Sequence, residues 1–206
     1  MSTLQLLAVG ALLVAGMMLL LWIYAVRQSN AGVVDIGWTA GLMIMAILCI
    51  AGSGYLPRST AAGGMVLLWG ARLGLHLWRR VIGQAEDARY RQLRVEWGAG
   101  ANRKFLFFFQ MQAVLVLVLS TPLLIVRLNA VPGLFLSEYA GIGLMILSIA
   151  GEWIADRQLN AFKARSGSRG VTCRAGLWRY SRHPNYFFEW LVWLGLALFA
   201  LGSPYG

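Results

Sequence analysis

Long apolar runs separated by polar, mostly cationic stretches dominate the 206-residue chain. A helix needs about 20 predominantly apolar residues to cross the roughly 30 Å hydrocarbon core of a bilayer. Runs of about this length lie at residues 4–26, 33–52, 61–79, 105–127, 134–155 and 184–202. The pattern therefore predicts an all-α protein, a polytopic membrane helix bundle with six spans in this chain.

The composition agrees with a membrane protein. Hydrophobic residues make up 59% of the chain and charged residues 13%, and the mean hydropathy is +0.64, which is too apolar for a soluble domain. Residues 1–206 are accordingly expected to form a single integral membrane domain. The first run lacks a cationic leader and is long enough to span, so we expect a retained helix rather than a cleaved signal peptide.

The net charge of +10 is concentrated in alternate connections between the runs. Fifteen Lys and Arg residues lie in the connections after the first, third and fifth runs, whereas the other connections hold only Arg58 and Arg127. Cytoplasmic loops of membrane proteins carry the excess of cations. This predicts an outward N-terminus, cytoplasmic connections at 83–104 and 156–183 that form a cofactor site, and a bacterial inner (plasma) membrane location.

Charge and cysteine usage also exclude some partners. Cations confined to loops disfavour nucleic-acid binding, which needs a continuous basic surface. Cys49 and Cys173 are the only cysteines and lie in unrelated segments, so neither a disulfide framework nor a metal-binding spacing is available. We therefore expect membrane lipids and a lipophilic small molecule as partners, with no metal and no nucleic acid.

The stretch from Gly176 to Trp193 joins a cationic turn directly to an apolar helix. Pro184 suits the first turn of a helix, because its missing N–H would be unsatisfied there. Asn185, Glu189 and Trp193 then share one helical face. Polar groups at membrane depth are costly and usually functional. The binding candidates in this stretch are Arg179, Arg182, His183, Asn185, Tyr186 and Glu189.

Two other runs carry polar residues at helical spacing. The end of the fifth run places Glu152, Asp156 and Lys163 on one face that continues past the membrane surface. The third run places Arg72 four residues before His76, and an Arg at that depth has to meet a carboxylate, a phosphate or water. Glycines in the same run predict close approach of a neighbouring helix. Pro122 in the fourth run predicts a kink.

Asp35 opens the second run, three residues before Trp38. A charge at this depth either faces the bundle or a wet cavity, or it caps the first helical turn while the tryptophan lies in the headgroup belt. The residues leave both interpretations open. The connection that follows the third run has helical propensity, with acidic residues at its start and Arg94 later, as a helix dipole prefers.

The motifs of soluble nucleotide enzymes do not occur: there is no G-x-G-x-x-G after a strand, no P-loop, no serine elbow and no kinase signature. What remains is a helix-walled, cytoplasm-facing pocket with cations, carboxylates and aromatic rings. Arginine forks bind phosphates, aromatic rings stack on planar groups, and carboxylates accept hydrogen bonds from hydroxyls. This set favours an anionic, ring-containing cofactor, and the apolar half of the pocket would admit a lipid-soluble substrate.

Four ordered motifs resemble one known family: VVDIGW, GQAEDARYRQLRVEWG, EWIADRQLNAFK and GLWRYSRHPNYFFEW. The family is the integral-membrane group that shares the steroid 5-alpha-reductase C-terminal domain (domain of unknown function 1295, DUF1295), and the resemblance covers most of residues 33–202. Related steroid 5-alpha-reductases reduce a carbon–carbon double bond next to a ketone with NADPH, from a seven-helix bundle. The resemblance implies NADPH contacts at Asp156, Lys163, Asn185 and Glu189, with Arg72, Arg179 and Arg182 as the matching cations.

The chain departs from the reductases at two points. The reductases polarise the ketone with a Glu on the second helix and a Tyr on the third, where this chain has Asp35 and Trp69. An indole N–H cannot supply a phenol's proton, so Asp35 or Tyr90 is the expected proton donor. The family also continues into a further helix and a basic tail, so we expect the end at Gly206 to belong to a truncated product or to a variant without that wall of its pocket.

The sequence thus predicts an enzyme, a membrane-embedded NADPH-dependent reductase acting on the C=C bond of a lipophilic enone or steroid-like substrate. The alternative is a membrane methyltransferase that uses S-adenosylmethionine, because isoprenylcysteine carboxyl methyltransferases carry a similar Arg-His-Pro-x-Tyr turn. Their motif continues into an Arg and a Glu-Glu pair that this chain lacks. A third class is a non-catalytic lipid-binding or scaffold protein.

Overall fold

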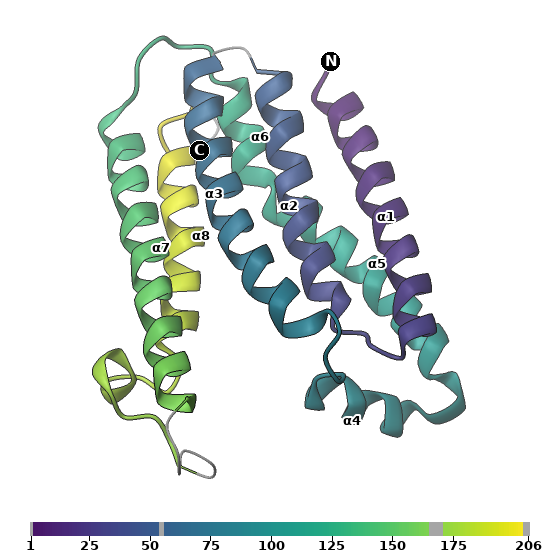
Figure 1. Cartoon of the computed structure of the whole chain (residues 1–206). Helices are drawn as coiled ribbons and strands as arrows, with labels where there is room; N and C mark the ends of the chain where they lie inside the picture. Colours follow the sequence, from purple (N-terminus) through teal and green to yellow (C-terminus); the bar gives the residue numbers. More distant parts are fainter. Residues whose placement is uncertain (1, 54–55, 165–170, 204–206) are drawn as a thin grey trace. The chain divides into compact units, whose positions relative to one another are not determined.

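The structure is a computed structural model that describes residues 2–53, 56–164 and 171–203, and within these ranges every regular element is helical (Figure 1). This confirms the all-α prediction. The α-helices are α1 (Thr3–Gln28), α2 (Val33–Ala51), α3 (Leu56–Val81), α4 (Ala88–Trp97), α5 (Ala101–Leu119), α6 (Thr121–Leu128), α7 (Leu136–Lys163) and α8 (Pro184–Ala200). Two short 3₁₀ helices, η1 (Gly98–Gly100) and η2 (Gly176–Arg179), complete the set.

Prolines mark two helix boundaries. The fourth apolar run is divided, because α5 ends at Leu119 and α6 begins at Thr121 with Pro122 in its first turn. Proline lacks the N–H that an α-helix needs and its ring clashes with the preceding turn, so the predicted kink is confirmed. Pro184 is the first residue of α8, as expected.

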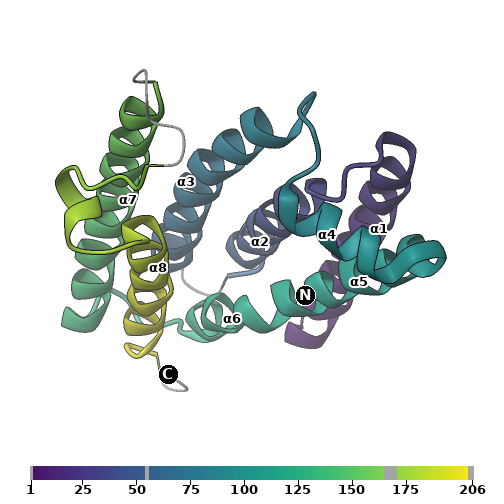
Figure 2. The same cartoon turned by 90° about the horizontal axis from the view of Figure 1, so that it is seen from below.

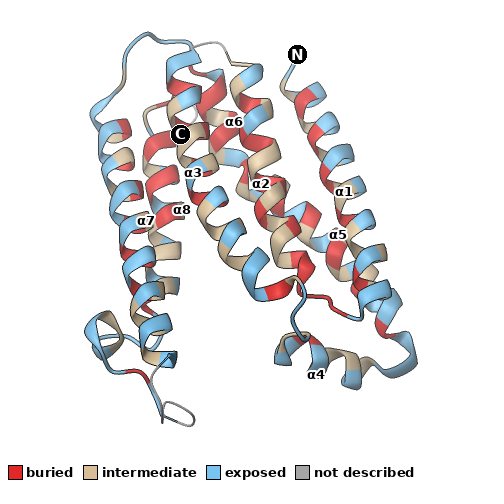
Figure 3. Cartoon of the chain, viewed as in Figure 1, coloured by how far each residue is buried: buried red, intermediate tan, exposed pale blue. Residues whose placement is uncertain are grey.

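Four helical segments within the described residues are long and apolar enough to cross a membrane: α1, α2, the segment from Ala88 to Leu128, and α7. Exposed residues recur along the length of α1 (Figure 3). They include Leu4, Leu12 and Leu20, as would be expected of a lipid-facing helix. The structure therefore has the character of an integral membrane protein. The number of six spans remains a prediction, since α3 carries Arg72 within its apolar part and α8 has 17 residues. The outward N-terminus also remains a prediction.

The helices fall into two compact units, Met1–Val131 and Pro132–Gly206. In the first unit, α1, α2 and α3 lie side by side, while α5 packs on α1 and α2, and α6 packs on α2 and α3 (Figure 2). The second unit is an antiparallel pair formed by α7 and α8. Each unit positions its own set of candidate residues.

Small residues bring α2 and α3 together, as the sequence predicts. A Cβ added at Gly63 would lie 2.6 Å from the side chain of Ile50, and one at Gly70 would lie 2.6 Å from that of Met43. The two glycines therefore mark the line along which α3 approaches α2. Glycines that let a neighbouring helix approach closely are typical of helix packing in membranes.

Two arginines that the charge count assigned to loops are buried instead. Arg58 is fully buried, and its Nη1 donates to the carbonyl oxygens of Asn129 at 3.1 Å and Val131 at 2.5 Å. Arg127 is also buried, with its Nη1 3.2 Å from Oγ1 of Thr3. Arg58 thus binds carbonyl groups at and just after the end of α6, where a helix leaves carbonyls unpaired, and Arg127 binds the Thr3 hydroxyl at the start of α1.

The α7–α8 contact supplies a stability test. A Cβ added at Gly141 would lie 2.7 Å from the carbonyl oxygen of Gly195 and 2.9 Å from the backbone nitrogen of Phe199, and neither backbone atom can move independently. We expect Gly141→Ala to destabilise the protein by about 1–3 kcal/mol, seen as a lower Tm in detergent. Gly143→Ala is the matched control, because its Cβ would meet nothing within 4 Å. Equal Tm values for the two variants would contradict this packing.

Candidate functional site

The structure brings Asp35 and Tyr90 together in the first unit. The two residues are 55 positions apart, yet the hydroxyl of Tyr90 donates a hydrogen bond of 2.8 Å to Oδ1 of Asp35. Arg89 donates to the Tyr90 hydroxyl oxygen, and its Nη2 lies 3.5 Å from Oδ1 of Asp35. Hydrogen bonds to ionised groups are stronger than those between neutral partners. We call these three residues the Asp35–Tyr90–Arg89 array.

Burial separates the roles of the two proton-donor candidates. Tyr90 is 1% exposed, and its ring packs edge-on against Phe105 and Phe108, with centroids 6.4 and 6.2 Å away. The Asp35 side chain is 40% exposed. The Asp35 carboxylate is therefore the accessible member of the array, and the buried Tyr90 hydroxyl fixes its position through the hydrogen bond.

The start of α2 is bound to the connection between α3 and α4. Asn30, in the α1–α2 turn, donates from Nδ2 to the carbonyl oxygens of Val81 at 3.3 Å and Gln84 at 3.1 Å. Asn30 is buried, so these bonds replace ones that water would otherwise make. They hold the end of α3 beside the turn that precedes Asp35.

Glu86 makes the second tie between these segments. Its Oε1 accepts a hydrogen bond of 2.8 Å from the backbone N–H of Ala31. Arg94, in the last turn of α4, donates to Oε1 at 2.8 Å and to Oε2 at 3.1 Å, a bidentate pair. Glu86 thus joins the α1–α2 turn to α4, the helix that carries Tyr90.

Hydrogen bonds lower the pKa values of Glu86 and Asp87, the two acidic residues before α4. Burial alone would raise the pKa of Glu86, but the hydrogen bonds from Arg94 and from the Ala31 N–H together hold it below its usual value. The N–H of Arg89 lowers the pKa of Asp87, which caps α4. Both carboxyl groups are therefore ionised at neutral pH and ready to pair.

The second unit holds nine of the ten residues that the sequence assigns to a cofactor, on α7, α8 and the connection between them. On α7, Glu152 is buried, Asp156 is half-buried and Lys163 is exposed. A Cβ at Gly151 would clash with the ring of Phe188. This contact sets Glu152, the next residue of α7, near the level of Phe188 on α8. Asn185 lies about one helical turn before Phe188 on the same helix.

The 3₁₀ helix η2 is tied to α7 by two hydrogen bonds. The indole N–H of Trp178 donates to the carbonyl oxygen of Ala155 at 2.9 Å. The backbone N–H of Leu177 donates to Oε1 of Gln158 at 2.8 Å. Arg179, the last residue of η2, is thereby held near the C-terminal half of α7.

Exposed arginines and the backbone N–H groups of a helix N-terminus lie at the start of α8. Arg179 and Arg182 are exposed, and neither makes an ion pair with any carboxylate in the described part of the chain. His183 precedes Pro184, and no side chain caps the helix there. The backbone N–H groups of the first turn are the donors that helix N-termini offer to anions.

The other predicted residues of this group lie on α8 itself. Asn185 and Glu189 are half-buried and one helical turn apart, and Oε1 of Glu189 lies out of solvent. The ring of Tyr186, an exposed residue, is 5.2 Å from that of His183. Part of the predicted 156–183 connection, residues 165–170, lies outside the described residues.

Arg72 is the one predicted cofactor-binding residue that does not belong to the second unit. It lies half-buried on α3, in the first unit, on the same helical face as His76. The array and Arg72 thus belong to one unit, and the remaining candidates to the other. Among the described residues, no group of three or more His, Cys, Asp or Glu side chains is placed to hold a metal ion.

A model of the family described as "Protein of unknown function (DUF1295)" matches residues 21–205. The chain belongs to the DUF1295 family. The resemblance seen in the sequence motifs is thereby confirmed for this family. No curated protein and no solved structure matches the chain, so the activity of this DUF1295 protein has to be argued from its own residues.

Trp69 is the residue that the sequence resemblance would set against the tyrosine of steroid 5-alpha-reductases. In this DUF1295 protein Trp69 is fully buried, and its ring packs edge-on against Trp38 with centroids 5.8 Å apart. It is therefore part of the core of the first unit. The phenol that reaches Asp35 comes from α4 instead.

Sequence reasoning missed Arg89 and the pairing of Glu86 with Arg94. Arg89 was one of many loop cations, and only its position next to Tyr90 set it apart. Glu86 and Arg94 are eight residues apart and Glu86 precedes the helix, so the usual spacings of three or four residues do not reveal the pair. The acidic start and basic end of this segment were the available signal.

The pairing of Glu86 predicts a pH-dependent stability. We expect Glu86→Gln to cost about 1 kcal/mol at pH 7, a value reduced for solvent screening. The pKa of Glu86 is lower in the folded state than its unfolded value of about 4.3. The stabilisation is therefore complete above that value and is lost as the pH falls through the folded pKa.

Thermal unfolding in detergent between pH 3 and pH 8 measures this effect. The difference in Tm between wild type and Glu86→Gln should shrink towards zero at the acid end of the range. Glu96→Gln is the control, because the exposed Glu96 carboxylate accepts a hydrogen bond from Gln92 within its own helix and, among the described residues, from no other segment. A Glu86→Gln difference that stays constant down to pH 3 would contradict this assignment.

Proposed function

We propose that this protein is a membrane-embedded NADPH-dependent reductase that saturates the C=C bond of a lipophilic enone. The observation that carries the proposal is the 2.8 Å hydrogen bond between Tyr90 and the accessible carboxylate of Asp35. Reduction of an enone requires a hydride and a proton. A hydrogen-bonded carboxyl–phenol pair at the end of an apolar helix is suited to the second requirement.

The chain's own residues would handle the proton as follows. Asp35 would carry the transferable proton on the carboxyl oxygen that faces the substrate, while Tyr90 keeps its own hydroxyl hydrogen and donates it to Oδ1 of Asp35. When the Asp35 proton moves to the substrate, one negative charge stays on the carboxylate, where the Tyr90 hydrogen bond and the guanidinium of Arg89 at 3.5 Å stabilise it. The exposed side of Asp35 then takes up a proton from water.

The second unit has the chemistry that a dinucleotide needs. Arg179 and Arg182 are exposed cations suited to phosphates, and the uncapped start of α8 offers backbone N–H groups. The Asn185 amide suits a carboxamide, while the Glu152, Asp156 and Glu189 carboxylates suit ribose hydroxyls. Lys163, His183 and Tyr186 complete the proposed set in this unit, and Arg72 of the first unit is the remaining proposed cation. When bound, NADPH would supply the hydride.

A methyltransferase remains the second candidate, because one observation favours it. Arg182, His183, Pro184 and Tyr186 form the Arg-His-Pro-x-Tyr turn, with the His183 and Tyr186 rings 5.2 Å apart. S-adenosylmethionine, however, carries no phosphate, so it gives the exposed arginines less to bind. Methyl transfer to a carboxylate also needs no proton donor, so the Asp35–Tyr90 pair would have no role in that reaction.

Cofactor titration tests the binding half of this proposal. We expect millimolar NADPH to raise the Tm of the wild type in detergent by several degrees, because ligands that bind only the folded state stabilise it. Asn185→Ala and Arg182→Gln should remove most of the shift. Arg157→Gln is the matched control, since Arg157 is an exposed α7 cation that stacks on Trp153. A shift with S-adenosylmethionine and none with NADPH would reject the reductase.

Turnover tests the chemical half. With a panel of lipophilic enones and NADPH, Asp35→Asn should lower kcat by roughly 10²–10⁴-fold, the usual contribution of a general acid. Tyr90→Phe should lower kcat less, because the carboxyl remains. Both variants should keep the NADPH-induced Tm shift, and Glu96→Gln should behave like wild type. An unchanged kcat in Asp35→Asn would remove Asp35 from the reaction.

A further inference from the structure

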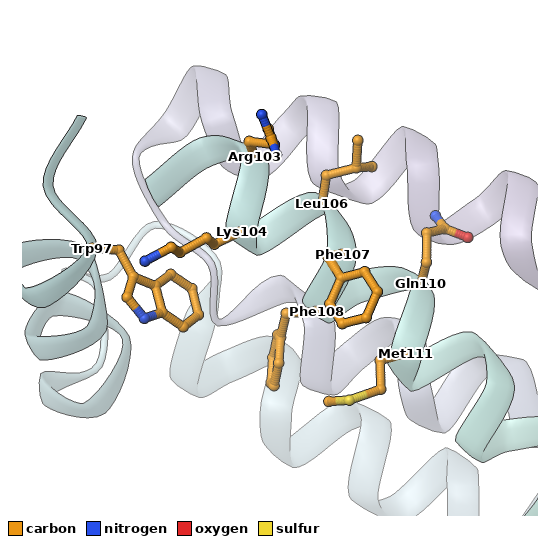
Figure 4. Close-up of a pocket in the computed structure, with 8 residues that line it drawn as sticks. All are labelled: Trp97, Arg103, Lys104, Leu106, Phe107, Phe108, Gln110 and Met111. Carbon is orange, nitrogen blue, oxygen red and sulfur yellow. The ribbon is translucent and has the colours of Figure 1, made fainter. Parts of the chain in front are cut away.

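A cavity of about 710 Å³ opens along α5, beside the end of α4 (Figure 4). Its lining includes Trp97, Arg103, Lys104, Phe107, Phe108 and Met111. Asp35 and Tyr90 do not line it. The cavity is therefore a feature that the proposed reaction leaves unexplained.

One end of the cavity is cationic. Arg103 and Lys104 lie in the first turn of α5, and Lys104 extends towards Trp97, with Nζ 5.7 Å from the centre of the indole ring. Neither cation makes an ion pair with a carboxylate within residues 2–53, 56–164 and 171–203. Lysine, arginine and tryptophan together at the end of an apolar helix are typical of the headgroup level of a bilayer.

The rest of the cavity is apolar. Lys104, Phe107, Phe108 and Met111 share one face of α5, at positions i, i+3, i+4 and i+7. At 1.5 Å per residue this face runs for about 10 Å from the cation to the thioether. Phe107 and Met111 are exposed, although large exposed apolar side chains are unfavourable in water. The one amide of the lining, Gln110, instead donates to the carbonyl oxygen of Ala15 on α1 at 3.4 Å.

We propose that this cavity binds an anionic phospholipid of the surrounding bilayer. The phosphate lies against Arg103 and Lys104, and an acyl chain follows Phe107 and Met111 along α5. Charge complementarity selects an anionic headgroup, and the length of the apolar face selects a chain. A soluble anion would leave that face uncovered, and a sugar or nucleotide would lack polar partners on it.

The lipid is not the substrate of the proposed reductase. Phe108 lines the cavity, and its ring packs edge-on against the ring of Tyr90, with centroids 6.2 Å apart, whereas neither Tyr90 nor Asp35 lines the cavity. Tyr90 in turn lies between Phe108 and Asp35. The bound chain therefore packs against the side chain that supports Tyr90, without access to the carboxylate.

Native mass spectrometry of the detergent-solubilised chain tests the proposal, with phosphatidylglycerol and phosphatidylcholine as probes. Phosphatidylglycerol should bind at least several-fold more tightly than phosphatidylcholine. Lys104→Gln and Arg103→Gln should each weaken phosphatidylglycerol about fivefold, the factor expected for one cation near an anionic lipid. The matched control is Arg27→Gln, which removes an exposed cation at the end of α1 that does not line the cavity.

The acyl chain has its own control pair. Phe107→Ala should weaken both lipids, whereas Phe187→Ala, at an exposed phenylalanine of α8, should weaken neither. Each substitution is at an exposed side chain, and an unchanged Tm without lipid verifies folding. Equal binding of the two lipids, or equal effects of Lys104→Gln and Arg27→Gln, would overturn the proposal. Competition by millimolar inorganic phosphate or NADPH would assign the cations to a soluble anion and would also overturn it.

Discussion

The carboxylate of Glu86 connects three segments that the candidate acid–base chemistry requires. It accepts from the backbone of the α1–α2 turn and from Arg94 at the end of α4. Asp35 lies a few residues after that turn and Tyr90 lies near the start of α4. Their 2.8 Å contact therefore depends on a carboxylate that belongs to neither helix. A short loop of six residues between α3 and α4 holds this arrangement.

Cations occupy three different environments in this protein, and the environments correspond to different roles. Arg58 is buried and binds the carbonyl groups at the end of α6, so its role is structural. Arg89 and Arg94 pair with carboxylates and position the array. Arg179 and Arg182 are exposed without a carboxylate partner in the described residues, which leaves them available to an external anion. Charge alone does not distinguish these cases, because burial and pairing set the cost of each cation.

The two compact units divide the candidate chemistry. The first contains the Asp35–Tyr90–Arg89 array and the cavity along α5, and the second contains the exposed arginines and the polar face of α8. Within the first unit, Phe108 contacts both the cavity and Tyr90. Lipid packing and the position of the phenol are thus linked by one aromatic ring.

The sequence alone determined the long helices, which follow from apolar runs of helical length and from the prolines at two boundaries, Pro122 and Pro184, and it indicated the polar helix α4 through helical propensity and its acidic start. It also placed Asn185 and Glu189 on one face of α8, because helical spacing is a local property. The sequence did not determine the contacts between segments that are far apart in the chain. Asp35 could cap α2 or face a cavity, and only the packing of α4 against the start of α2 decided that a phenol would meet it. The same holds for Arg58, whose burial depends on where α6 ends in space, because tertiary contacts carry no periodic signal in the chain.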